Sequence, residues 1–211
     1  MRIAIIGSGR VGGALAQALG RAGHEVRFGV REPDPRKPDP GKPAEIAIAD
    51  AAAFADLAIL AVPFDAVEGI VAAAGGFVGK VLIDATNPLG MRDGGLGLIM
   101  GFETSGAEQI AALAPLAHVF KAFNQTGFEN MAQAHAYASP PVMFVAGDDE
   151  AGKTLVMRLI ADTGFEAIDA GKLRAARLLE PYAMLWIELA RKHGHGAEFA
   201  FALQRMGGNK G

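Results

Sequence analysis

The sequence predicts an α/β fold of the Rossmann type, in which a doubly wound parallel sheet is followed by a small helical C-terminal domain. The first observation is an apolar run, residues 3–6, that leads into a glycine-rich turn and then into an alanine-rich helical pattern. The second is that short apolar runs alternate with helical patterns along most of the chain, which is typical of a parallel sheet. The third is one long helical pattern in the last third.

The glycine-rich turn reads Gly7-Ser8-Gly9-Arg10-Val11-Gly12 and has the spacing of a dinucleotide-binding motif. Gly7 allows the tight turn after the strand, Gly9 lets the backbone approach a pyrophosphate, and Gly12 lets the helix pack close to the strand. The free amides at the start of the helix then favour the phosphates. The motif predicts a nucleotide site at the beginning of the chain.

Composition excludes several classes of partner. The chain has 20 Lys and Arg against 23 Asp and Glu, so its formal charge of −3 gives no global attraction to nucleic acid or to anionic lipid. It has no cysteine, which excludes disulfides, thiolate zinc sites and a cysteine nucleophile. The longest apolar runs, such as residues 57–64, are too short to cross a bilayer. We expect a cytoplasmic protein with no membrane segment and no bound metal.

The second strand ends at the position that distinguishes NADP from NAD. Helical periodicity over residues 11–22 is followed by Gly23-His24 and by an apolar run, residues 25–30, that completes a β-α-β unit. Val30 then precedes Arg31, whose guanidinium can bind a 2′-phosphate and stack on adenine. Glu32 is the competing signal, since an acidic residue there would hold the ribose of NAD. We expect NADP as the cofactor.

Residues 33–43 contain five prolines, which fix φ and remove backbone donors, so this segment is predicted to be a surface loop. Arg36 and Lys37 lie within it and could reach the same 2′-phosphate, although a solvated tether is the simpler interpretation.

Further strands are predicted near residues 46–48, at 57–62 and at 81–84, with a helix at 65–74 between the last two. Because the carboxyl ends of such strands border the ligand, Val62 and Pro63 should lie beside the cofactor. The loop after the next strand places Asn87 at the same edge, where its amide could bind a carboxamide. An Asn-Pro turn with no ligand explains the same residues, and both interpretations stay open.

The second half of the chain continues the alternation. Residues 90–101 are glycine-rich and apolar, which indicates a flexible lid or part of a flat apolar pocket. Helices are predicted at 107–113 and 150–162, and strands at 118–120, 142–146 and 165–169. Residues 147–150 are acidic and are interpreted as a helix start rather than a metal site.

Residues 175–193 form one helical pattern that Pro181 should bend or divide. Its apolar set includes Leu178, Leu185, Trp186 and Leu189, which favours a homodimer through this helix, although packing onto the sheet explains it almost equally well. We expect residues 1–140 to form the NADP-binding domain and residues 141–211 a smaller α/β-helical region that completes the substrate pocket.

Four further segments of the sequence are informative: VPF at 62–64, ATNPL at 85–89, KAFNQTG at 121–127 and AGKLRAARLLEP at 170–181. Together with the glycine motif they resemble one known family, the NADPH-dependent reductases of the deazaflavin coenzyme F420, and the resemblance extends over nearly the whole chain. It implies phosphate binding by Ser8, Gly9, Arg10 and Val11, and 2′-phosphate binding by Arg31. It also implies that the nicotinamide half of the cofactor lies near Val62, Val67, Asn87, Pro88, Ala122, Phe123 and Asn124. Gln125 stands where a threonine is common in the family.

The resemblance implies a hydride exchanged between NADP(H) and a deazaflavin or flavin, with no dedicated acid or base, so no catalytic residue is assigned. A reductase of a small carbonyl or imine compound would need a proton donor, for which Lys121 and the histidines are the candidates. A redox-sensing NADP-binding module without catalysis is the third possibility. For an extended aromatic acceptor, we expect contacts with Leu89, Trp186, Gly194 and His195.

Overall fold

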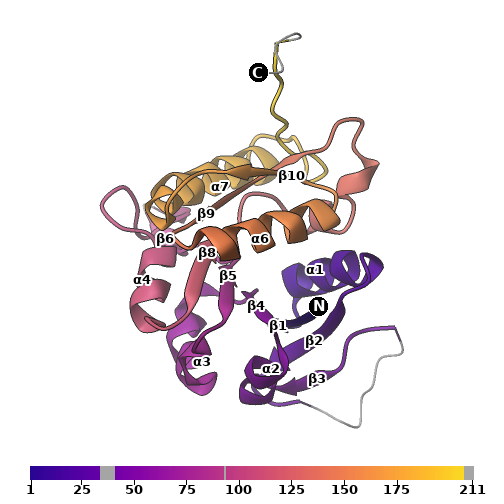
Figure 1. Cartoon of the computed structure of the whole chain (residues 1–211). Helices are drawn as coiled ribbons and strands as arrows, with labels where there is room; N and C mark the ends of the chain where they lie inside the picture. The colour runs from indigo at the N-terminus through magenta and orange to yellow at the C-terminus, as the bar shows by residue number, and fades with distance from the viewer. Residues whose placement is uncertain (34–40, 93, 207–211) are drawn as a thin grey trace.

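The computed structural model describes residues 1–33, 41–92 and 94–206, so Arg36 and Lys37 lie outside the described residues. Within that part, eight strands form one sheet in the order β10-β9-β8-β5-β4-β1-β2-β3 (Figure 1). All neighbouring strands are parallel except β8 and β9, which are antiparallel. The strands are β1 (Arg2–Ile6), β2 (Glu25–Val30), β3 (Glu45–Ala47), β4 (Leu57–Leu60), β5 (Val81–Asp84), β8 (His118–Lys121), β9 (Val142–Gly147) and β10 (Glu166–Asp169).

Helices cover both faces of this sheet, because the central strands are apolar on both sides. One face packs against α1 (Arg10–Arg21), α5 (Phe128–Met131) and α6 (Glu150–Asp162). The other packs against α2 (Ile48–Phe54), α3 (Val67–Ala73), α4 (Gly106–Leu113) and the beginning of α7 (Ala176–Arg191). Short 3-10 turns lie at η1 (Phe64–Ala66), η2 (Gly75–Phe77), η3 (Ala134–Ala136) and η4 (Leu173–Ala175). None of the described helices combines the length and apolar character that crossing a bilayer requires.

The doubly wound α/β fold that the sequence predicts is confirmed. The strands at 25–30 and 81–84 and the helix at 150–162 have the predicted bounds. Asp149 accepts a hydrogen bond from the amide of Gly152 (2.6 Å), so the acidic residues 147–150 do begin a helix.

The structure adds detail to two predicted segments. Within residues 90–101, for which the sequence indicated a flexible lid or part of a flat apolar pocket, β6 (Leu89–Arg92) and β7 (Gly95–Leu98) pair as an antiparallel hairpin, and both interpretations stay predictions. Pro181 does not divide its helix, because α7 is continuous from Ala176 to Arg191. The two residues before the proline are held by other elements: the Leu179 carbonyl accepts from Asn124, and the Glu180 carboxylate binds Lys121.

The expected boundary near residue 140 falls between β8 and β9, which are neighbours in the same sheet. Phe120 pairs with Gly147 and Lys121 with Ala146, so residues 1–140 and 141–211 share a continuous sheet. The division into two domains stays a prediction. The segment after α7 returns to this sheet, where the amide of Val142 donates to the carbonyl of Phe201 (2.9 Å).

Candidate functional site

The glycine turn after β1 leaves an open space at the start of α1. Gly7 has a φ of 107°, and a Cβ there would lie 2.5 Å from the carbonyl oxygen of Ala61. A Cβ on Gly12 would overlap the carbonyl of Gly7, so the helix approaches the strand closely. At Gly9, the N-cap of α1, nothing lies within 4 Å of an added Cβ. The turn is therefore closed toward the core and open at the helix terminus, which fits an anionic ligand.

Two side chains of this turn face solvent. Ser8 and Arg10 are exposed, and the Arg10 guanidinium lies 5.0 Å from the centre of the Phe128 ring. This cation–π contact holds a positive charge beside the start of α1 without pairing it to a carboxylate. The start of α1 is thus arranged so that it can bind phosphate through four consecutive residues, Ser8, Gly9, Arg10 and Val11.

A pocket of about 510 Å³ lies beside the turn, at the carboxyl ends of β1 and β2. It includes five residues that the sequence assigned to the cofactor, Gly7, Val30, Arg31, Val62 and Pro63. It also includes residues that the sequence analysis missed: Ile48, Asp65, Ala66 and Ile70. Asp65 and Ala66 follow Pro63 closely, so the rule that strand ends border the ligand could have identified them. Val67 is only 2% exposed and packs in the core.

The ends of β5 and β8 bring together the residues expected at the nicotinamide. Asn87 donates from Nδ2 to the carbonyl of Asn124 (2.9 Å), and Asn124 donates from Nδ2 to Oδ1 of Asn87 (3.0 Å). Pro88, Ala122 and Phe123 are buried, whereas Asn87 is partly exposed. One amide hydrogen and one lone pair of Asn87 stay available to a ligand, so a carboxamide contact stays a prediction.

Phe123 has an unusual backbone conformation, with a φ of 59° although it is not a glycine. A bulky residue in this region is strained, and such strain is found where the surrounding packing fixes a functional turn. Phe123 is fully buried, and its amide donates to Sδ of Met143 (3.2 Å). The chain therefore turns sharply between Ala122 and Asn124, directly after β8.

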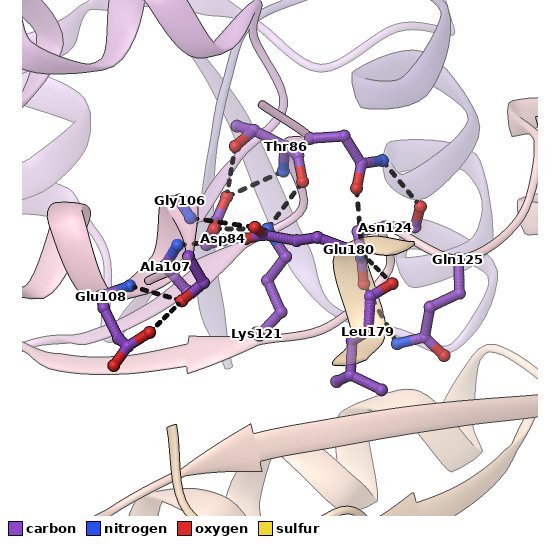
Figure 2. Close-up of polar contacts among 12 residues, drawn as sticks. Asp84, Thr86, Gly106, Ala107, Glu108, Lys121, Asn124, Gln125, Leu179 and Glu180 are labelled. Atoms are coloured by element: carbon purple, nitrogen blue, oxygen red, sulfur yellow. Dashed lines mark hydrogen bonds and ion pairs between the residues drawn. The ribbon is translucent and has the colours of Figure 1, made fainter. Parts of the chain in front are cut away.

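Beneath these loops lies an ionic cluster that the sequence analysis did not find. Figure 2 shows Asp84, Thr86 and Glu180 converging on Lys121. The Lys121 ammonium lies 2.7 Å from Oδ2 of Asp84 and 2.9 Å from Oε1 of Glu180, and it donates to the carbonyl of Thr86 (2.8 Å). All three charged side chains are fully buried. Lys121 is therefore a paired interior group rather than a free proton donor.

Helix α4 begins next to this cluster. Oε2 of Glu180 accepts from the amide of Gly106 (3.0 Å), and Oε1 accepts from that of Ala107 (3.2 Å). Ser105 caps the helix by accepting from the amide of Glu108 (3.2 Å). Arg177 donates to the Glu108 carboxylate (2.7 Å), and this hydrogen bond, assisted by that of Ser105, lowers the pKa of Glu108. The beginnings of α4 and α7 are thus joined by two carboxylates.

The residues expected to contact the acceptor are not all placed as predicted. Leu89 begins β6 and is partly exposed beside Pro88. Trp186 is only 3% exposed: its ring stacks on Phe199 at 5.4 Å, and its Nε1 donates to the Phe199 carbonyl (2.9 Å). It is enclosed by the segment after α7 instead of forming an open wall. Gly194 and His195 are exposed on that segment, and their contact with an acceptor stays a prediction.

The comparisons with known proteins agree with this geometry. The family model described as NADP oxidoreductase, coenzyme F420-dependent, matches residues 2–88. A crystal structure of a candidate F420-dependent NADP-reductase from Arthrobacter sp. FB24 is 32% identical, covers 97% of this chain and 100% of its own, and superposes with a TM-score of 0.86. A hypothetical protein from Sinorhizobium meliloti is 27% identical over 83% of this chain and 87% of its own, with a TM-score of 0.71.

Imine reductases share the fold. The enzyme from Bacillus cereus is 16% identical over 89% of this chain and 60% of its own, with a TM-score of 0.65, which shows similarity of fold alone. The Arthrobacter protein, with its 32% identity and full coverage, shows membership of the same family and not only similarity of fold. This chain belongs to the coenzyme F420-dependent NADP oxidoreductase family, and it is an oxidoreductase that uses NADP(H).

Proposed function

We propose that this protein transfers a hydride between NADP(H) and a deazaflavin or flavin ring. The observation that carries the proposal is the state of Lys121, the lysine at the end of β8. Reduction of a carbonyl or an imine needs a positioned proton donor, but the side chain of Lys121 is fully buried: its ammonium donates to Asp84 and to the carbonyl of Thr86 and forms an ion pair with Glu180. Hydride transfer between two rings requires orientation and exclusion of water, for which a dedicated acid is unnecessary.

In this proposal the cofactor extends along the carboxyl edge of the sheet. The start of α1 holds the pyrophosphate, and Arg31 binds the 2′-phosphate at the pocket beside β2. Asn87 and the residues Ala122, Phe123 and Asn124 contact the nicotinamide half. NADP(H) supplies the hydride when bound, while the chain supplies the surface that orients it.

The acceptor would lie against the β6–β7 hairpin. The hairpin begins at Leu89, directly after Asn87 and Pro88, and its strand β7 packs against α7. The pairing of Gly90 with Gly97 leaves one cross-strand position of the hairpin without side chains. The Ile99 side chain covers Gly90, where an added Cβ would lie 2.5 Å from its Cγ2, whereas at Gly97 the nearest described atom is Cβ of Arg92 at 3.8 Å, so a flat ring could approach the backbone there. Gly194 and His195 are the proposed contacts on the far side of the acceptor.

An assay of NADPH consumption tests the proposal. Purified protein is mixed with NADPH and, in separate reactions, coenzyme F420, FMN, FAD, a small ketone and a cyclic imine, and the loss of NADPH absorbance is followed. We expect turnover with F420 or a flavin and background rates with the ketone and the imine. Turnover confined to the ketone or the imine would contradict the proposal. Tight NADP binding without turnover of any compound would favour a redox-sensing module.

We also propose a homodimer formed through α7. Leu178 and Leu185 are 67% and 50% exposed, although both are large apolar residues on one helix. Trp186 does not contribute to this surface, because it is buried. Light scattering at micromolar concentration should give the dimer mass for the wild type and the monomer mass for Leu178→Glu/Leu185→Glu. A monomeric wild type would contradict the proposal. A cytoplasmic location stays a prediction.

A further inference from the structure

The Lys121 cluster joins four segments that are distant in the sequence. Asp84 and Lys121 are paired neighbours at the ends of β5 and β8, and Glu180 comes from α7. Through its two oxygens Glu180 also binds the first amides of α4. A single set of contacts therefore fixes two strand ends and two helices.

Polar contacts surround the ammonium of the cluster. Lys121 donates to Asp84 and to the carbonyl of Thr86 and forms an ion pair with Glu180, while Oδ1 of Asp84 accepts from the amide (2.8 Å) and hydroxyl (2.7 Å) of Thr86. Two carboxylates face one ammonium, and the amides at the start of α4 compensate the second negative charge. Buried ion pairs of this kind often contribute no more to stability than apolar residues of the same volume would. A contribution to stability is therefore a weak explanation for the presence of this ionic cluster.

The cluster adjoins the loops proposed to hold the nicotinamide. Thr86, bound by both Asp84 and Lys121, is followed directly by Asn87. Asn124, three residues after Lys121, donates to the carbonyl of Leu179 (3.1 Å), the neighbour of Glu180. Figure 2 shows these contacts side by side, with Asn124 bridging toward Leu179. Two consecutive residues of α7 thus contact the end of β8 and the loop after it, and Lys121 and Asn124 in turn bind the loop after β5.

The geometry points to Lys121 and Glu180 as positioning residues for hydride transfer. They set the distance between two parts of the site: the loops at the ends of β5 and β8, which hold the nicotinamide, and α7 with the β6–β7 hairpin, which holds the acceptor. This inference rests on the proposed function. Displacement of reacting groups by about 1 Å can cost on the order of 100-fold in rate, so a loosened cluster should impair transfer before it impairs NADPH binding.

The first test compares two buried lysines. Lys121→Met removes the ammonium of the cluster, whereas Lys153→Met removes an ammonium that is 4% exposed on α6 and pairs with Glu150 and Asp169. We expect Lys121→Met to lower kcat for the acceptor about 10-fold to 100-fold with an NADPH Kd within about twofold of the wild type. Lys153→Met should leave both constants unchanged. Equal effects of the two substitutions would contradict the inference.

Glu180→Gln provides a second variant if Lys121→Met, which leaves two buried carboxylates, fails to fold. It preserves the shape of the side chain, keeps an oxygen acceptor and leaves Lys121 paired with Asp84. We expect a lower kcat and a higher KM for the acceptor at unchanged NADPH Kd, with a smaller loss for Glu180→Asp, which restores the charge. Wild-type kcat and KM in Glu180→Gln, or a parallel loss of NADPH affinity, would overturn the inference.

A measurement made without an acceptor tests the positioning role of Lys121 and Glu180 separately from the proposed hydride transfer. The fluorescence anisotropy of protein-bound NADPH, at saturation, reports how rigidly the nicotinamide is held. It should fall in Glu180→Gln and stay at the wild-type value in Lys153→Met. If the wild type turns over neither F420 nor a flavin, the proposed function fails while this comparison still decides the inference. Equal anisotropy in Glu180→Gln and wild type would then overturn it.

Discussion

The phosphate turn and the ends of β5 and β8 occupy the same edge of the sheet but are built in opposite ways. At Gly9, no atom of the described residues, apart from the adjoining backbone, lies within 4 Å of the position that a Cβ would take. At Lys121, a fully buried ammonium donates two hydrogen bonds and pairs with two carboxylates. The first region presents backbone that side chains leave free, so we expect an added side chain there to interfere with a ligand. The second is held together by side chains that fill the interior, so we expect the removal of one of them to disturb the site.

The largest effect is expected from filling the open region. Gly9→Val should weaken NADPH binding about 100-fold or more, since losing two charge-assisted hydrogen bonds costs about 3 to 6 kcal/mol. The fold should persist, because the Cβ position of Gly9 lies in open space among the described residues. Titration calorimetry measures the affinity, and circular dichroism measures the fold.

Gly20→Val is the matched control, since Gly20 lies on α1 with nothing within 4 Å of its Cβ position. Its affinity for NADPH should equal that of the wild type. Unchanged affinity in Gly9→Val would mean that the glycine turn is only a turn.

The second-largest effect is expected on stability, when the buried side chain of Trp186 is removed. Trp186→Ala should lower the free energy of unfolding by about 3 to 5 kcal/mol, because it empties a buried aromatic site and removes the hydrogen bond to Phe199. Urea denaturation followed by circular dichroism measures this loss. NADPH affinity, measured on the folded variant, should be unchanged. A stable variant with reduced acceptor turnover would instead support the contact with the acceptor that the sequence predicted.

The difference between the two regions also explains what the sequence could predict. The phosphate turn is made of consecutive residues whose spacing is itself the signal, so Gly7, Gly9 and Gly12 could be assigned before the structure was known. The role of Arg31 could also be predicted from the sequence, because the fold fixes its position directly after β2.

The rest of the site depends on contacts between distant segments. Lys121 was visible as a lysine after an apolar strand, but nothing local indicates that Asp84 and Glu180 would meet it. The periodicity of α7 identified Trp186 as apolar without showing that Phe199 covers it. The glycines of the β6–β7 hairpin concealed its register, since pairing is weakly specified in glycine-rich strands.

Arg31→Ala should have a smaller effect than Gly9→Val, and a selective one. Removing one charge-assisted contact costs about 1.5 to 3 kcal/mol, which corresponds to roughly a tenfold or larger loss of NADP affinity. NAD carries no 2′-phosphate, so its affinity should not change. Arg27→Ala is the control, because Arg27 lies on β2, the strand that Arg31 follows, is partly exposed and pairs with Glu25. Equal losses for NADP and NAD would assign Arg31 to the shared part of the cofactor.

The smallest effect is expected at the opposite edge of the sheet, where Arg2 and Asp56 form an exposed ion pair (2.6 Å). Hydrogen bonds from the side chain and backbone of Arg2 lower the pKa of Asp56 to about 2. The carboxylate therefore stabilises the fold above its ordinary pKa of 3.8, and this contribution is lost as the pH falls toward 2. Asp56→Asn should shift the urea midpoint slightly at neutral pH and not at all below pH 2. A shift comparable to that of Trp186→Ala would show that the exposed pair was underestimated.

The most direct test of the proposed hydride transfer follows the hydrogen itself. Two samples of NADPH, each carrying deuterium at a different face of nicotinamide C4, are mixed separately with the protein and oxidised coenzyme F420 in ordinary water, and the reduced deazaflavin is analysed by mass spectrometry and NMR. If the two rings are held against each other at the ends of β5 and β8, the deuterium of one sample should be transferred to the ring carbon of the deazaflavin, and that of the other sample should be retained on the nicotinamide. Hydrogen derived from solvent, or equal transfer from both faces, would contradict direct transfer between oriented rings.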